Sequence, residues 1–171
     1  MPTRLVAASA LAAAAALIIG PVAGCTPTAA KDVAVGDCVQ MSGPPDRAET
    51  TPAPCGSAES NYTVVAVVSG GGTDIRGCPS DVDSSYSSQN AFSDQSTTIC
   101  LDVDWVVGGC MSVDADSGQG PYRVNCDDAT APGRQRATEI MRGVANVDQC
   151  ASGQGYAYDE RDFTVCVEDV S

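Results

Sequence analysis

The sequence contains no histidine and few large aromatic side chains. Without histidine, Ser-His-Asp and Cys-His catalysis, the HExxH zinc motif and any imidazole general base are excluded. One tryptophan, two phenylalanines and five tyrosines in 171 residues leave little bulky material for a core. A domain of this composition needs covalent cross-links. We therefore expect a disulfide-stabilised protein that is not an enzyme, and the sequence indicates no cofactor.

Basic residues are also scarce: the chain has nine basic and 22 acidic residues, so its formal net charge is −13. Such a surface repels nucleic acid and anionic lipid headgroups, so no nucleic-acid partner is expected. A strongly acidic surface is typical of a soluble exported protein. A cationic partner or a metal ion is the alternative reading of the charge.

Residues 1–24 have the organisation of a bacterial lipoprotein signal peptide. Arg4 precedes an uncharged, alanine-rich run over 5–20, for which we expect an apolar signal helix. The residues Val-Ala-Gly-Cys at 22–25 resemble a lipobox. We expect cleavage between Gly24 and Cys25, and a diacylglyceryl group and further acyl chains such as palmitate on Cys25. Two acyl chains hold a protein firmly at a membrane.

This reading makes 25–32 a lipidated tether and places the secreted chain on the extracytoplasmic face of the cell membrane. The alternatives are an ordinary signal peptide, whose first cysteine forms a disulfide, and an uncleaved anchor helix. Eight cysteines follow Cys25. Because this number is even, Cys25 is left without a disulfide partner, which favours lipidation.

The eight remaining cysteines fall into two similar sets of four. Their intervals are 17, 23 and 22 residues in the first set and 16, 24 and 16 in the second. The sequence around them also repeats, since 35–39 resembles 107–111 and 55–58 resembles 126–129. We expect an internal duplication, with one four-cysteine unit at 33–104 and another at 105–171.

Each unit is predicted to be mainly β with little helix. The run 134–142 has helical propensity, but its counterpart 62–68 is rich in β-branched residues, so we expect a strand there too. A short helix is expected over 79–87, because proline suits a first helical turn. The strands are expected at 34–41, 51–56, 61–68, 97–103, 106–113, 121–126, 137–144 and 161–168.

An exported chain meets an oxidising compartment, so its cysteines are expected to form disulfides. Sequence alone leaves many pairings open. If both units repeat one scheme that joins neighbouring strands, the favoured pairs are Cys38–Cys55, Cys78–Cys100, Cys110–Cys126 and Cys150–Cys166. No CxxC motif occurs, so neither a redox dithiol nor a zinc knuckle is indicated.

Acidic clusters are the remaining candidates for chemistry. Asp114 and Asp116 resemble the opening of a calcium loop, but the fifth, sixth and twelfth positions do not fit an EF-hand. They are weak metal candidates, with 127–128 as further donors, and an ordinary turn is favoured.

Two other acidic segments have simpler readings. Asp102 and Asp104 alternate along a strand and are expected to face solvent. The run 159–162 supplies paired carboxylates, but nothing in the sequence places a second carboxylate across a cleft, and a charged turn explains it better.

The lipobox, Val-Gly-Asp-Cys at 35–38, Cys55 followed by alanine at 58, Tyr-x-Val-Val at 62–65 and Cys-Pro at 78–79 resemble the LppU-like lipoproteins of mycobacteria and related actinobacteria. The pattern is also similar to the extracytoplasmic domain labelled septum formation. This resemblance implies a cell-envelope location and no established catalytic residue. We expect a non-enzymatic envelope module that binds or scaffolds an exported protein. The alternative is a small-molecule or divalent-metal-binding lipoprotein that uses acidic turns or a cleft between its two units.

Overall fold

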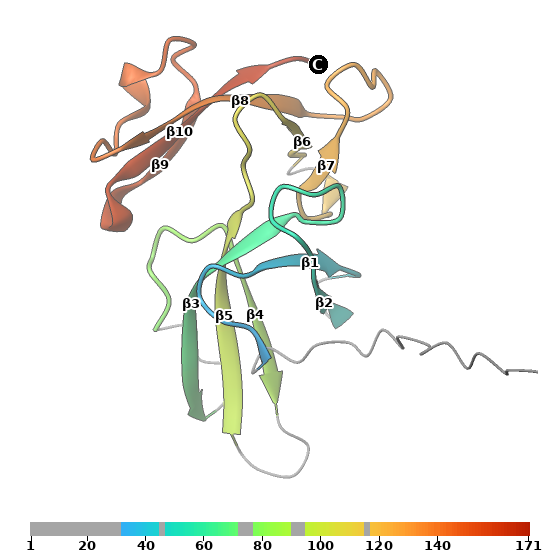
Figure 1. The fold of residues 1–171 in the computed structure, drawn as a ribbon, viewed down its shortest axis with the longest axis vertical. Helices are drawn as coiled ribbons and strands as arrows, with labels where there is room; N and C mark the ends of the chain where they lie inside the picture. Colours follow the sequence, from blue (N-terminus) through green and yellow to red (C-terminus); the bar gives the residue numbers. More distant parts are fainter. Residues whose placement is uncertain (1–31, 45–46, 72–76, 90–94, 115–116) are drawn as a thin grey trace, which may run out of the picture.

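The computed structural model describes residues 32–44, 47–71, 77–89, 95–114 and 117–171. Over these residues the protein forms two antiparallel five-stranded sheets and contains no α-helix (Figure 1). The mainly β prediction is therefore confirmed. The expected signal helix, the cleavage site and Cys25 lie outside the described residues.

Each sheet is built from one of the two units. The first contains β1 (Cys38–Ser42), β2 (Glu49–Pro52), β3 (Tyr62–Gly71), β4 (Ser84–Gln89) and β5 (Gln95–Val103). The second contains β6 (Cys110–Ser112), β7 (Tyr122–Val124), β8 (Arg134–Arg142), β9 (Gly155–Tyr158) and β10 (Phe163–Asp169). Figure 1 shows the second sheet stacked above the end of the first.

The two sheets match strand for strand. Their orders are β2-β1-β3-β5-β4 and β7-β6-β8-β10-β9. Even the irregularities repeat, because the β3–β5 register shifts between Val64 and Ala66 and the β8–β10 register shifts beside Cys166. Gly36 and Gly108 occupy equivalent turns with positive φ angles of 94° and 86°. The duplication thus extends from the cysteines to the topology, the bulges and the turns.

All four favoured disulfides are present in the structure. They are Cys38–Cys55, Cys78–Cys100, Cys110–Cys126 and Cys150–Cys166, with sequence separations of 17, 22, 16 and 16 residues. The two pairs of each unit occupy equivalent places in the two sheets. Closing loops of this length stabilises a fold by about 3 kcal/mol each, which offsets the shortage of large core residues.

The two hydrophobic cores are small and meet at one residue. The first consists of Val33, Val39, Tyr62, Val64, Ile99 and Leu101. The second consists of Trp105, Met111, Ala137, Tyr158, Val165 and Val167. Val103, the last residue of β5, packs against both, so the apolar interior continues from one unit into the other.

The predicted helix at 79–87 is wrong, because 79–83 contain turns and no helix, and β4 begins at Ser84. β9 was not expected either. Both are short edge strands, and β4 has the sequence Ser-Ser-Tyr-Ser-Ser-Gln, which has no apolar run. Pairing with the central strands determines their structure: Tyr86 lies opposite Ile99, and Tyr156 lies opposite Val165 at the matching position. The strand expected over 137–144 is confirmed as β8, which begins earlier, at Arg134.

Candidate functional site between the two units

Arg161 of the second unit lies at the centre of the contact between the units. It ends a 3-10 turn just before β10. Its Nη1 donates a hydrogen bond to Oδ2 of Asp102 on β5. Its Nε donates to Oδ1 of Asp81 at 3.1 Å, and its Nη2 donates to the Asp81 carbonyl oxygen at 3.1 Å. One guanidinium therefore binds two separate segments of the first unit.

Aromatic rings fix this guanidinium from the other side. The rings of Tyr158 and Phe163 are stacked with centroids 4.3 Å apart. The Cζ atom of Arg161 lies 4.9 Å from the first centroid and 5.4 Å from the second. The Tyr158 hydroxyl donates to Oδ2 of Asp83 at 2.7 Å. Burial and the nearby Asp83 carboxylate raise the pKa of Tyr158, so its hydroxyl remains a donor.

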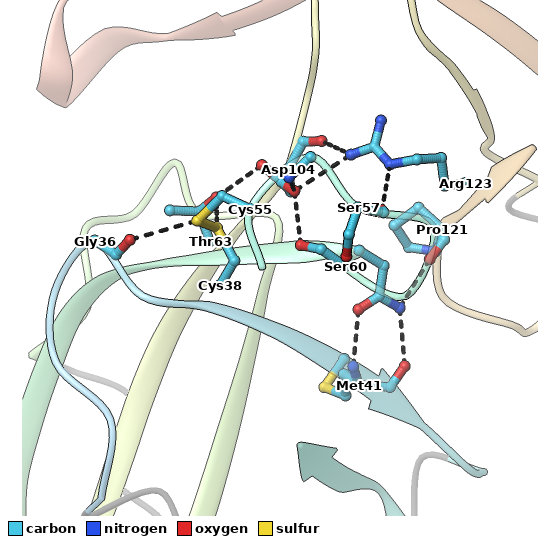
Figure 2. Close-up of polar contacts among 12 residues, drawn as sticks. Gly36, Cys38, Met41, Cys55, Ser57, Ser60, Thr63, Asp104, Pro121 and Arg123 are labelled. Atoms are coloured by element: carbon cyan, nitrogen blue, oxygen red, sulfur yellow. Dashed lines mark hydrogen bonds and ion pairs between the residues drawn. A yellow bond between two sulfur atoms is a disulfide. The ribbon is translucent and has the colours of Figure 1, made fainter. Parts of the chain in front are cut away.

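A second inter-unit ion pair joins Asp104 to Arg123 (Figure 2). Oδ2 of Asp104 accepts hydrogen bonds from the Ser60 hydroxyl and the Gly56 amide, each at 2.6 Å, and lies 3.3 Å from Nη2 of Arg123. The same Nη2 donates to the Asp104 carbonyl oxygen, and Nε of Arg123 donates to the Ser57 carbonyl oxygen at 2.9 Å. Arg123 thus holds the loop before β3 and the end of β5 together.

Asn61 adds a neutral link between the units. Its side-chain amide exchanges two hydrogen bonds with the backbone of Met41, at 2.8 and 2.9 Å. The same amide nitrogen donates to the carbonyl oxygen of Pro121 in the second unit at 3.0 Å (Figure 2). The loop before Pro121 also packs closely, because a Cβ added to Gly120 would lie 3.1 Å from the Tyr62 hydroxyl oxygen.

These contacts correct the prediction that Asp102 and Asp104 face solvent. Asp102 is only 6% exposed and Asp104 only 7% exposed. Alternation on a strand predicts a shared face, but here the second unit covers that face and supplies one arginine to each acid. The acidic run 159–162 is a charged turn, as interpreted, and its arginine is the residue that binds the first unit.

Asp102 has an unusual electrostatic environment. Burial raises its pKa to about 6, and its hydrogen bond and charge interaction with Arg161 oppose that rise. The nearby Asp83 and Asp81 carboxylates add to it. Asp102 is therefore ionised at neutral pH but protonates in mildly acidic conditions.

A cleft of about 330 Å³ opens beside these ion pairs. Both units form its walls. The first unit contributes Thr63, Val65, Asp102, Val103 and Asp104, and the second contributes Trp105, Ile140, Arg142, Tyr158, Arg161, Phe163 and Val165. This volume and this mixture of apolar, aromatic and a few charged groups are typical of small-ligand sites.

Three polar groups around the cleft have no partner. Oδ1 of Asp102 and Nε1 of Trp105 are buried and accept or donate no hydrogen bond within the described ranges. Leaving such a group unpaired costs about 1–3 kcal/mol. Arg142, at the end of β8, is exposed, and its guanidinium makes no hydrogen bond or ion pair, unlike the other arginines in the described part of the chain. Sequence reasoning identified neither Trp105 nor Arg142.

A second hollow lies between the end of β1 and the 118–122 loop, with a volume of about 600 Å³. Its lining contains no charged side chain. Asn61, its most buried amide, is already fully engaged with Met41 and Pro121. The inter-unit cleft is smaller, but it alone of these two hollows combines aromatic walls with unpaired polar groups, and we take it as the candidate site.

The acidic turns do not assemble into a comparable site. Asp116 lies outside the described residues. Asp128 accepts hydrogen bonds from the amide and hydroxyl of Thr130, which lower its pKa and close a local turn. Within the described ranges, no three histidine, cysteine, aspartate or glutamate side chains are grouped so that they could hold a metal ion.

Comparisons with protein-family models, with curated proteins and with solved structures find no match for this chain. Over the described residues, no helix has the length and apolar character needed to span a membrane.

Proposed function

We propose that this chain is a lipid-anchored, non-enzymatic envelope protein that binds a small ligand in the cleft between its two units. The leader and the Val-Ala-Gly-Cys sequence at 22–25 support export and anchoring through Cys25. Four disulfides are consistent with an oxidising extracytoplasmic compartment. The LppU-like resemblance agrees with this location and is part of the proposal.

The inter-unit cleft is the observation that carries the binding role. Its walls come from both units, and the Asp102–Arg161 and Asp104–Arg123 pairs hold those walls in place. A site that is largely formed before the ligand arrives loses little conformational entropy on binding. The concave shape favours a small ligand over a protein partner, which usually needs a broad contact surface.

Native mass spectrometry of the protein, extracted from the envelope of cells that produce it, tests this role. We expect a non-covalent small-molecule adduct on the wild-type protein. Val65→Phe places a larger side chain in the cleft and should remove the adduct. Val107→Phe makes the same change at a position that is 55% exposed and outside the cleft lining, and should retain it.

Urea unfolding first establishes that both variants keep the wild-type fold. An adduct that is absent from the wild-type protein, or that binds Val65→Phe as well as Val107→Phe, would contradict the proposed binding role.

A further inference from the structure

We infer that the ligand of the cleft is a small organic anion with an apolar body and a single anionic group, which Arg142 binds. This inference rests on the proposed function, because it names the chemistry of the same site. Three features carry it: the charge balance of the lining, the unpaired arginine and the character of the walls.

Among the charged side chains that line the cleft, only one has no ion-pair partner in the described part of the chain, and it is a cation. Asp102 and Asp104 line the cleft, but each is already paired with an arginine: Asp102 with Arg161, which also binds Asp81, and Asp104 with Arg123. Neither acid is therefore available to bind a cationic ligand without breaking a buried pair. Arg142 is the remaining charged group of the lining, and no acid among the described residues forms an ion pair with it. The cleft thus offers an anion a local positive charge in a protein whose formal net charge is −13.

The isolation of Arg142 also limits the ligand's charge. A guanidinium can bind one carboxylate or one sulfonate through two parallel hydrogen bonds. A polyphosphate would bring charges that no other free cation of the cleft could meet, and the acidic surface around it would repel them. A monoanion fits this arrangement best.

The remaining walls are apolar and aromatic. Val65 of β3, Ile140 of β8, and Phe163 and Val165 of β10 line the same space. Trp105 adds its indole, which stacks on Tyr156 with ring centroids 5.4 Å apart. These surfaces suit an aromatic ring system or a short branched acyl group. They explain why the anion is expected to carry an apolar body rather than to be an inorganic ion.

Trp105 makes the inference directly measurable. It is the only tryptophan in the chain, so the indole N–H gives a single, unambiguous side-chain signal in a ¹H–¹⁵N spectrum. The probes are 2-naphthoate and its neutral analogue 2-naphthamide, which share a ring system and differ in charge. We expect both to shift the Trp105 signal and 2-naphthoate to bind about tenfold more tightly, as one charge-assisted contact allows.

Variants of two arginines on β8 distinguish an effect of the charge inside the cleft from an effect of the protein's overall net charge. Arg142→Gln should weaken 2-naphthoate binding to the level of 2-naphthamide, and Arg142→Lys should restore part of it. Arg136→Gln removes the same charge from an arginine that pairs with Glu168 outside the cleft lining, and should leave binding unchanged. The side chain of Arg142 makes no hydrogen bond or ion pair within the part of the chain that the structure describes, so both of its variants should keep the fold.

Equal affinity for the two probes, or an equal effect of Arg142→Gln and Arg136→Gln, would overturn the anion inference while leaving a cleft that binds ligands. A Trp105 signal that neither probe moves would overturn the inference as well. The adduct measured by native mass spectrometry decides the proposed binding role independently, because it does not depend on either probe.

Discussion

The guanidinium of Arg161 and the carboxylate of Asp102 form an ion pair between two units that are copies of one fold. The two side chains are only 19% and 9% exposed. Glu168 is the equivalent of Asp102 in the second unit, because each lies two residues after the fourth cysteine of its unit. Glu168 pairs with Arg136 inside its own sheet, whereas Asp102 pairs with an arginine of the other unit, so the two copies have diverged. The duplicated fold has thus acquired different contacts in its two copies.

Removing one partner of this pair should destabilise the protein strongly. Arg161→Met leaves the Asp102 carboxylate buried without its cation, and we expect a loss of about 3 kcal/mol in the free energy of unfolding. Arg136→Met is the matched control, because that arginine pairs with Glu168 at the surface, where the side chains are 38% and 42% exposed. The control should cost less than about 1 kcal/mol. Urea unfolding measures both, and equal losses would show that burial of the Asp102 pair is unimportant.

The stability of the protein should also depend on the ionisation of Asp102. Burial raises its pKa to about 6 in the folded chain, whereas it is near 4 in an unfolded chain. Between these values the folded state holds the proton more tightly, so the free energy of unfolding falls as the pH rises through this window. The stabilising contribution is complete below about pH 4 and lost above about pH 6.

Asp102→Asn removes this titration. The difference between the urea midpoints of the wild-type protein and of this variant should therefore change between about pH 4 and pH 6 and be constant at higher pH. Midpoints at half-unit pH steps provide the measurement. Parallel curves across the window would be incompatible with a raised pKa at Asp102.

Much of this fold follows from the sequence, because the cysteine spacing reveals the duplication and the duplication selects the disulfide pairing. The repeat also identified β8 as a strand despite its helical propensity. β4 and β9 were missed because edge strands take their conformation from the neighbours with which they pair. The buried state of Asp102 and Asp104 was missed for a related reason. Their arginines, Arg161 and Arg123, lie 59 and 19 residues away and approach only when the two units pack.

The disulfides of the second unit should contribute similarly to stability. Cys110–Cys126 and Cys150–Cys166 each close a separation of 16 residues, and each should stabilise the fold by about 3 kcal/mol. Double alanine variants of each pair test this by urea unfolding. A loss well below about 1 kcal/mol for either pair would mean that its loop is constrained by other contacts.

The two units are expected to unfold together. Val103 packs against both cores, and hydrogen bonds from Arg161, Arg123 and Asn61 cross between the units. Trp105 fluorescence reports on the second core, while circular dichroism reports on both sheets. Coincident urea transitions by the two probes are the expected result. Two separated transitions would indicate that the units are independent domains.

The anchor prediction concerns Cys25. Cys25→Ser removes the thiol that would receive the diacylglyceryl group, so acyl labelling should disappear and the precursor should remain uncleaved by the lipoprotein signal peptidase. The eight other cysteines are all paired with one another. Normal processing of the variant, followed on a gel after labelling with a fatty acid, would refute lipidation at this residue.

The position of a bound ligand tests the central claim most directly, since that claim places the site between the two units. Val65 of the first unit and Ile140 of the second unit both line the cleft. An isotope-filtered nuclear Overhauser experiment on the protein saturated with 2-naphthoate measures which methyl groups lie near the naphthyl protons. The account predicts contacts to the methyl groups of both residues, and contacts confined to one unit would contradict it.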